Sequence, residues 1–447
     1  MTDFPTRGDF PGDFTFGAAT AAFQIEGGQG SETGRGPSIW DDFSATPGNV
    51  LDDHDGRTAC DHYGRWESDL DLLRGGGFDA YRFSISWPRV QPDGAGAVNA
   101  AGLDFYERLV DGMLERGLRP FATLYHWDLP SVLEDRGGWR SREVPERFAD
   151  YAAIVARRLG DRLHSTATLN EPWCTAWLSH MIGRHAPGVR DIRAAARAMH
   201  HVGVAHGLGV RAMRAEGLGN LGIVTNHEAV VPFDGTPEAS EAARTWDGIL
   251  NRWFWEGLHR GQYPADILER LAPHMPDGFE GDMAIVGTPT DWHGVNYYTR
   301  SHWLPDPATT LWPAIRQVDA DGPKTALGWE VHPDGLREVL ERTAGYTGGL
   351  PLYVTENGAA FNDPAPGNGR VEDPDRVAYF AGHLRAARDA IDRGVPLRGY
   401  FAWSLLDNFE WAEGYNGRFG ICHVDFATLK RTPKASYHAF RHMLGGT

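Results

Sequence analysis

Eight short runs of apolar and β-branched residues recur along the 447-residue chain, and polar or amphipathic stretches separate them. Each run has the length of a β-strand rather than of a helix. Strands that alternate with helices are typical of a parallel sheet. The predicted strands are residues 14–18, 80–85, 121–124, 165–169, 221–225, 292–295, 352–355 and 399–403.

The stretches between these strands predict helices. Apolar residues recur at helical spacing in residues 63–74, 103–116, 145–159 and 375–393, with Pro145 near the start of one stretch. Eight strand–helix units over this length predict a single (β/α)8 TIM barrel domain, residues 1–447, with an active site at the C-terminal ends of the strands. A doubly wound open sheet is the alternative. It would be expected to carry a GxGxxG turn after the first strand, and the sequence has none there.

Composition excludes several classes of protein. Apolar residues make up 41% and charged residues 23%, which is typical of a globular chain. The net charge of -17 argues against nucleic acid or an anionic membrane as a partner. We find no apolar N-terminal leader and no run long enough to span a bilayer. Three cysteines without CxxC spacing indicate reduced thiols. We therefore expect a cytoplasmic protein, either a monomer or a homo-oligomer.

Polar and aromatic residues follow the predicted strands at their C-terminal ends. In a barrel these ends face one mouth, so residues far apart in the sequence should converge there. Indole rings can pack on the apolar face of a pyranose, while amides and carboxylates bind its hydroxyls. The mouth is therefore predicted to bind a sugar. The residues at these ends include Gln24, Arg82, His126, Trp127, Asn170, Glu171, Asn296, Tyr298, Glu356, Trp403, Glu410 and Trp411.

Glu171 and Glu356 follow the fourth and seventh predicted strands, which lie across a barrel from each other. A glutamate at the end of an apolar strand carries a desolvation cost unless it is paired or functional. Retaining glycosidases use two carboxyls about 5–5.5 Å apart, one as nucleophile and the other as acid and then base. The pair therefore predicts glycoside hydrolysis.

The sequence resembles glycoside hydrolase family 1. The likeness lies in the segments 14–27, 81–89, 123–130, 294–298 and 403–411. It is most specific where Asn170-Glu171-Pro172 and Thr355-Glu356-Asn357-Gly358 occur together. The resemblance runs in order over nearly the whole chain, and it implies a retaining β-glycosidase on a (β/α)8 barrel.

The resemblance also implies residue roles. Glu171 would be the acid/base and Glu356 the nucleophile, with Arg82 and Tyr298 in contact with Glu356. Of two neighbouring tyrosines, Tyr298 should face the pit and Tyr297 should pack, because neighbours in a strand point opposite ways. The residues assigned to the terminal sugar are Gln24, His126, Asn170, Trp403, Glu410 and Trp411; those assigned to the leaving group are Trp173 and Trp329; Trp127, Asn296 and Phe419 complete the predicted binding set.

The leading hypothesis is an exo-acting β-glucosidase that hydrolyses small β-glucosides or short β-linked oligosaccharides, without a cofactor or metal. The alternatives are a broader β-glycosidase with fucoside or galactoside activity, a 6-phospho-β-glycosidase, a non-catalytic sugar-binding barrel and a metal-dependent hydrolase. Glu410-Trp411 resembles members that bind an unmodified sugar. His200, His201 and His206 form no metal-binding motif. Cys174 is expected to be a small buried residue rather than a nucleophile.

Overall fold

Eight parallel strands form a closed barrel in the computed structural model, which describes residues 4–30, 33–309 and 311–446. Neighbouring strands pair in chain order, and the last strand of the ring pairs with the first. All eight predicted strands are present, so the predicted (β/α)8 TIM barrel is confirmed. The barrel strands are β1 (Thr15–Ala19), β2 (Ala80–Ser84), β3 (Arg119–Tyr125), β4 (Ser165–Asn170), β5 (Leu221–Pro232), β6 (Trp292–Pro305), β8 (Leu352–Asn357) and β9 (Leu397–Trp403).

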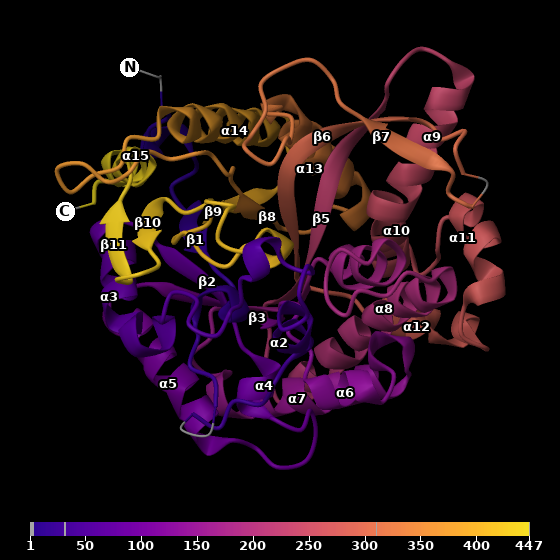
Figure 1. The fold of residues 1–447 in the computed structure, drawn as a ribbon, viewed down its shortest axis with the longest axis horizontal. Coiled ribbons are helices and arrows are strands. Elements are labelled where there is room, and N and C mark those ends of the chain that lie inside the picture. The colour runs from indigo at the N-terminus through magenta and orange to yellow at the C-terminus, as the bar shows by residue number, and fades with distance from the viewer. Residues whose placement is uncertain (1–3, 31–32, 310, 447) are drawn as a thin grey trace.

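Helices surround the strands as an outer layer (Figure 1). The four predicted helices are confirmed as α3, α5, α7 and α14, with small shifts at their ends. The helices are α1 (Ala22–Ile25), α2 (Ile39–Ser44), α3 (His62–Gly75), α4 (Trp87–Val90), α5 (Ala100–Glu115), α6 (Ser131–Asp135), α7 (Glu143–Leu159), α8 (Ile192–Ala215), α9 (Pro237–Asp247), α10 (Trp253–Arg260), α11 (Ala265–Leu271), α12 (Met283–Val286), α13 (Pro333–Thr347), α14 (Pro374–Asp392) and α15 (Ala435–Leu444).

Strands β5 and β6 are much longer than predicted. They continue to pair beyond the barrel, where Val230 lies opposite Ser301 and Pro232 opposite Trp303. Strand β7 (Ile315–Val318) adds to this extension by pairing antiparallel with the end of β6. Helix α9 packs against the extension (Figure 1). The result is a wall that rises beside the mouth of the barrel.

Aromatic side chains fill the barrel below the mouth. The ring of Phe121 packs against those of Phe401 and Tyr353, at centroid distances of 4.9 and 5.6 Å. Gly17 leaves room for this packing, since a Cβ atom there would lie 2.4 Å from the Phe401 ring. Barrel interiors are packed cores rather than pores. The aromatic packing therefore forms a closed floor beneath the C-terminal ends of the strands.

Two peripheral features complete the fold. Strands β10 (Cys422–Asp425) and β11 (Lys430–Pro433) form a small antiparallel hairpin. None of the helices in residues 4–30, 33–309 and 311–446 has both the length and the apolar character needed to cross a membrane.

Candidate active site

A cavity of about 710 Å³ opens at the C-terminal ends of the barrel strands. Its lining comes from segments throughout the chain, as expected for a barrel mouth. Most of the predicted site residues lie on its wall. They are His126, Trp127, Glu171, Trp173, Tyr298, Trp329, Glu356, Trp403, Glu410, Trp411 and Phe419.

Gln24, Arg82, Asn170 and Asn296 are not part of this lining. All four side chains are fully or almost fully buried directly behind it. They reach the wall through hydrogen bonds, so the structure brings these predicted residues to the same site. Their position indicates that they orient the residues in front of them as much as they contact a ligand.

Glu356 lies near the end of β8 and is 3% exposed. Arg82 Nη1 donates to its Oε1 at 2.5 Å, and the Tyr298 hydroxyl donates to its Oε2 at 2.6 Å. Both predicted contacts are therefore present, while the Tyr297 hydroxyl points elsewhere and donates to the carbonyl of His332. Burial raises the pKa of Glu356, and Arg82 and Tyr298 oppose this rise. These two donors favour the ionised carboxylate.

Glu171 follows β4 and is 5% exposed. Asn296 Nδ2 donates to its Oε1 at 2.7 Å, and Cys174 Sγ donates to its Oε2 at 3.0 Å. No cation forms an ion pair with it among the described residues. Burial, followed by the negative charge of Glu356, raises the pKa of Glu171 to about 8. Of the two carboxyls, Glu171 is therefore the one that carries a proton at neutral pH.

A chain of hydrogen bonds connects the two glutamates. Arg82 Nη2 and Asn296 Nδ2 both donate to Oδ1 of Asn170, at 2.7 and 3.0 Å. Arg82 thereby links Asn170 to Glu356, and Asn296 links it to Glu171. Such a network fixes rotamers because most of its polar atoms have partners; among the described residues, Arg82 Nε is an exception. It holds the carboxyls in one arrangement across the barrel.

Other polar side chains at the cavity lie beside aromatic rings or behind the lining. His126 stacks on Trp403, with ring centroids 5.7 Å apart. Gln24 Nε2 donates to Glu410 Oε2 at 3.3 Å. In the part of the chain that the structure describes, Gln24 Oε1 and His126 Nδ1 are buried without a hydrogen-bond partner. Buried polar atoms are rarely left unpaired. Of the two, His126 lines the cavity and is placed to meet a ligand, whereas Gln24 lies behind the lining.

Three site residues have left-handed backbone conformations. The φ angles are +78° at Trp127, +49° at Glu171 and +50° at Trp411. Non-glycine residues rarely adopt this conformation, which costs on the order of 1–3 kcal/mol each and persists where the surroundings impose it. Here the left-handed conformation sets the direction of two indole rings and one carboxyl group, at the ends of barrel strands and in the loops that follow them.

The sequence analysis missed part of the wall. Glu228 on β5, Trp246 on α9 and Trp303 on β6 all line the cavity. Trp246 stacks on Trp303 at 4.2 Å and donates a hydrogen bond to Glu228. The polar run Asn226-His227-Glu228 after the fifth predicted strand was an available signal, because the same pattern identified the other strand ends.

The histidines considered for a metal have structural partners. His200 hydrogen-bonds the Tyr263 hydroxyl, His201 the carbonyl of Trp139 and His206 the hydroxyl of Thr168. Across the described ranges, no three His, Cys, Asp or Glu side chains are grouped so that they could hold a metal ion.

An ionised carboxylate in the same cavity as a carboxyl that keeps its proton is the arrangement with which enzymes cleave glycosidic bonds. On this barrel it makes the chain a glycoside hydrolase that acts on O-glycosyl bonds.

Comparisons with known proteins also identify the chain as a glycoside hydrolase. Residues 6–445 match the family model "Glycosyl hydrolase family 1". The chain is 49% identical to a β-glucosidase of Agrobacterium sp., covering 98% of this chain and 95% of that one. It is 43% identical to a 1,4-β-D-glucan glucohydrolase of Thermotoga neapolitana, over 97% and 98% of the two chains. A Thermotoga maritima β-glucosidase in complex with glucoimidazole superimposes with a TM-score of 0.94 at 44% identity, covering 98% and 99%. The chain belongs to glycosyl hydrolase family 1.

Proposed function

We propose that this protein is a retaining, exo-acting β-glucosidase in which Glu356 is the nucleophile and Glu171 the acid/base. The observation that carries the assignment is the unequal surroundings of the two buried carboxyls. Glu356 accepts hydrogen bonds from Arg82 and Tyr298, whereas Glu171 has no cationic partner within the described residues and has its pKa raised to about 8. One group is thus set to attack and the other to give a proton.

In the first step, a carboxylate oxygen of Glu356 bonds to the anomeric carbon while the bond to the leaving-group oxygen breaks. Glu171 transfers its proton to that oxygen, so the aglycone departs as a neutral alcohol. We assign the 2-hydroxyl to Asn170, next to Glu171, a contact that strengthens as the oxocarbenium character develops. The product of this step is the glucosyl group of the substrate bound to Glu356 through an α-linked ester.

In the second step, the negative charge of Glu356 is gone because it has become an ester. One of the two causes that raise the pKa of Glu171 therefore disappears, and Glu171 becomes a better base for water. Water attacks the anomeric carbon from the β face, gives its proton to Glu171 and releases β-glucose. Glu356 is regenerated as a carboxylate.

The sugar side of the cavity supports a terminal glucose. His126 lines the cavity with Nδ1 unpaired among the described residues, Trp403 stacks beside it, and Gln24 supports Glu410 from behind the lining. The barrel is filled below this point, which suits an enzyme that accepts only the end of a chain. The relatives reported above are named as glucosidases or a glucan glucohydrolase, which favours plain glucosides over 6-phosphoglycosides.

The anomer of glucose that is released first tests the proposal. In proton NMR of 4-nitrophenyl β-glucoside hydrolysis, we expect β-glucose to appear first and α-glucose to grow only by mutarotation. Appearance of α-glucose first would contradict a double displacement.

Because Glu171 must be protonated in the first step, kcat/KM is expected to fall as the pH rises through about 8.

The wall beyond Glu171 supports a sugar as the leaving group. Trp173 meets Trp246 edge to face at 5.5 Å, and Trp246 stacks on Trp303. Two buried polar atoms on this side, Trp173 Nε1 and Asn226 Oδ1, lack a partner among the described residues. Aromatic surface beside free donors and acceptors fits short β-linked oligosaccharides.

Trp303→Ala is expected to raise KM for cellotetraose about fivefold and to change KM for nitrophenyl glucoside less than twofold. The reason is that an aromatic contact contributes about 1 kcal/mol, and only the longer substrate reaches this wall. Steady-state kinetics on cello-oligosaccharides of two to five units measures the effect. Trp312→Ala, outside the cavity lining, is the control. Equal changes on both substrates would contradict the assignment.

We also propose a cytoplasmic enzyme that works as one domain over residues 1–447. The cysteines Cys60, Cys174 and Cys422 are buried free thiols, which suits a reducing compartment. The barrel and its surrounding elements extend from Arg7 to Leu444. Cell fractionation against periplasmic and cytosolic markers tests the location.

A further inference from the structure

Cys174 is more than the small buried residue expected from the sequence. It begins the irregular helix Cys174–Ile182 that follows Glu171, and it lines the cavity. Its Sγ lies 3.0 Å from Oε2 of Glu171, within hydrogen-bonding distance for sulfur. The thiol therefore touches the carboxyl that we propose as the acid/base.

The two partners of Glu171 differ in what they can do. The Asn296 amide nitrogen can only donate a hydrogen bond, and it occupies Oε1 at 2.7 Å. A thiol can donate weakly through its S–H and can also accept weakly at sulfur. Only a partner of the second kind can keep a favourable contact when the carboxyl gains or loses its proton.

We propose that Cys174 is a positioning residue that follows the protonation state of Glu171, donating its S–H to Oε2 of the carboxylate and turning to accept when Glu171 carries its proton. The inference rests on the proposed role of Glu171. After the first step, the donated S–H stabilises the carboxylate just formed. Before that step, the thiol accepts a hydrogen bond from the protonated carboxyl, which holds the acidic proton on Oε2 until the leaving-group oxygen takes it.

The thiol keeps its own proton throughout. Burial, with Glu171 next in importance, raises the pKa of Cys174 well above its ordinary value. Cys174 is therefore a neutral hydrogen-bonding group and not a nucleophile. The titratable and charged groups that act on Glu171 or Cys174 from other elements are Arg82, Glu356, Tyr298, Glu410 and Glu228.

Two substitutions at Cys174 should move the pH profile in opposite directions. Cys174→Val removes the donor and fills a similar volume, so the basic limb of kcat/KM is expected to rise by about half a pH unit, because the carboxylate loses a hydrogen bond. Cys174→Ser supplies a stronger donor, so the basic limb is expected to fall by a similar amount, about half a unit. The acidic limb, which reports Glu356, should stay in place.

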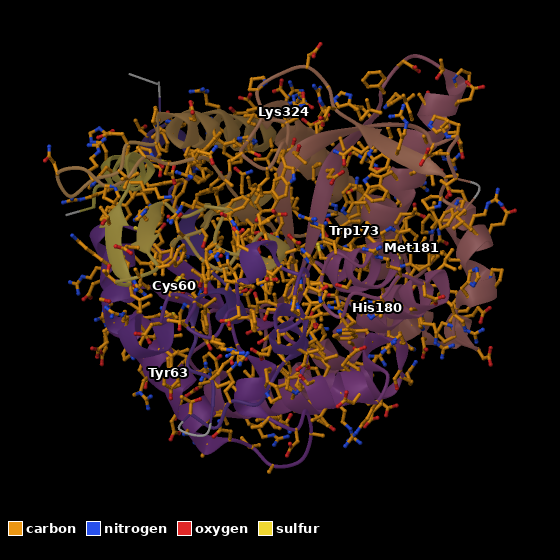
Figure 2. All side chains as sticks on the ribbon, in the orientation of Figure 1. Cys60, Tyr63, Trp173, His180, Met181 and Lys324 are labelled. Atoms are coloured by element: carbon orange, nitrogen blue, oxygen red, sulfur yellow. The ribbon has the colours of Figure 1, made fainter. Side chains whose placement is uncertain are left out.

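Cys60→Val is the matched control. Cys60 is also a buried thiol that donates a hydrogen bond, but its acceptor is the carbonyl of Asp407. Cys60 lies well to the left of Trp173, the chain neighbour of Cys174, in Figure 2. This variant should keep both limbs of the wild-type profile. Basic limbs that are unchanged in Cys174→Val and Cys174→Ser, or that shift in the same direction, would overturn the proposal.

Infrared spectroscopy tests the contact without substrate. The S–H stretching band that disappears in Cys174→Val belongs to Cys174. In the wild type this band should move to lower wavenumber as the pH rises, with the midpoint of the basic limb, because a carboxylate is a stronger acceptor than a carboxylic acid. A band that does not move would overturn the proposal. Failure of the proposed function would appear separately, as absent turnover of β-glucosides by the wild type.

Discussion

Glu356→Ala is expected to lower kcat for 4-nitrophenyl β-glucoside by about 10⁵-fold or more, the scale seen when a hydrolase loses its nucleophile. Without this carboxylate no covalent intermediate can form, and Arg82 and Tyr298 then face an empty space. Stopped assays over hours, with the protein's folding checked by circular dichroism, measure the residual rate.

Added azide gives the same variant a diagnostic product. A small anion can enter the space that the Glu356 carboxylate leaves, attack from the α face and yield α-glucosyl azide. Glu134→Gln is the control, since Glu134 is another largely buried glutamate whose pKa burial raises to about 7, and it pairs with Arg140 outside the cavity. It should keep turnover within about threefold of the wild type, as for most changes away from the reacting atoms. Substantial activity in Glu356→Ala would remove the residue from its proposed role.

Glu171→Ala is expected to have an effect that depends on the leaving group. A poor leaving group such as the glucose of cellobiose needs a proton, so kcat/KM should fall by about 10²–10⁴-fold, the range of general acid catalysis. 2,4-Dinitrophenolate needs none, and kcat/KM for its glucoside should fall by less than about tenfold. A plot of log kcat/KM against the pKa of the aglycone measures this dependence. Glu171→Ala should show a slope in this plot that the wild type lacks.

The second step also slows in Glu171→Ala because water has no base. The covalent intermediate should then accumulate, giving a burst of dinitrophenolate and a lowered KM. Azide attacks this intermediate from the β face, so β-glucosyl azide is the expected product, opposite to that of the Glu356 variant. Equal losses on all aglycones, or the same azide anomer from both variants, would show that the two roles are wrongly assigned.

Local sequence patterns were enough to predict the barrel and most of the residues at its mouth, whereas Trp329 and Phe419 were assigned only through the family resemblance. Short β-branched runs and the polar residues after them are local signals, and they identified Glu171 and Glu356 correctly as neighbours in one cavity. The contacts of Arg82 and Tyr298 with Glu356 came from the family resemblance, and the structure contains both.

The missed residues depend on long-range pairing. Strands β5 and β6 extend past the barrel because each satisfies the other's backbone groups, and no local pattern within either run marks where that pairing stops. Trp303 was therefore placed outside a strand, and Trp246 had no reason to be linked with it. The role of the Cys174 thiol depends on its distance to Glu171, which a sequence cannot provide.

The left-handed backbone conformations at Trp127, Glu171 and Trp411 limit where the molecule can change to become more stable to heat. Relaxing any of the three would redirect a ring or a carboxyl, so greater thermal resistance has to be gained elsewhere, in the outer helices and their ion pairs. Laboratory selection for survival at high temperature should accordingly enrich changes on the periphery and leave these three positions untouched.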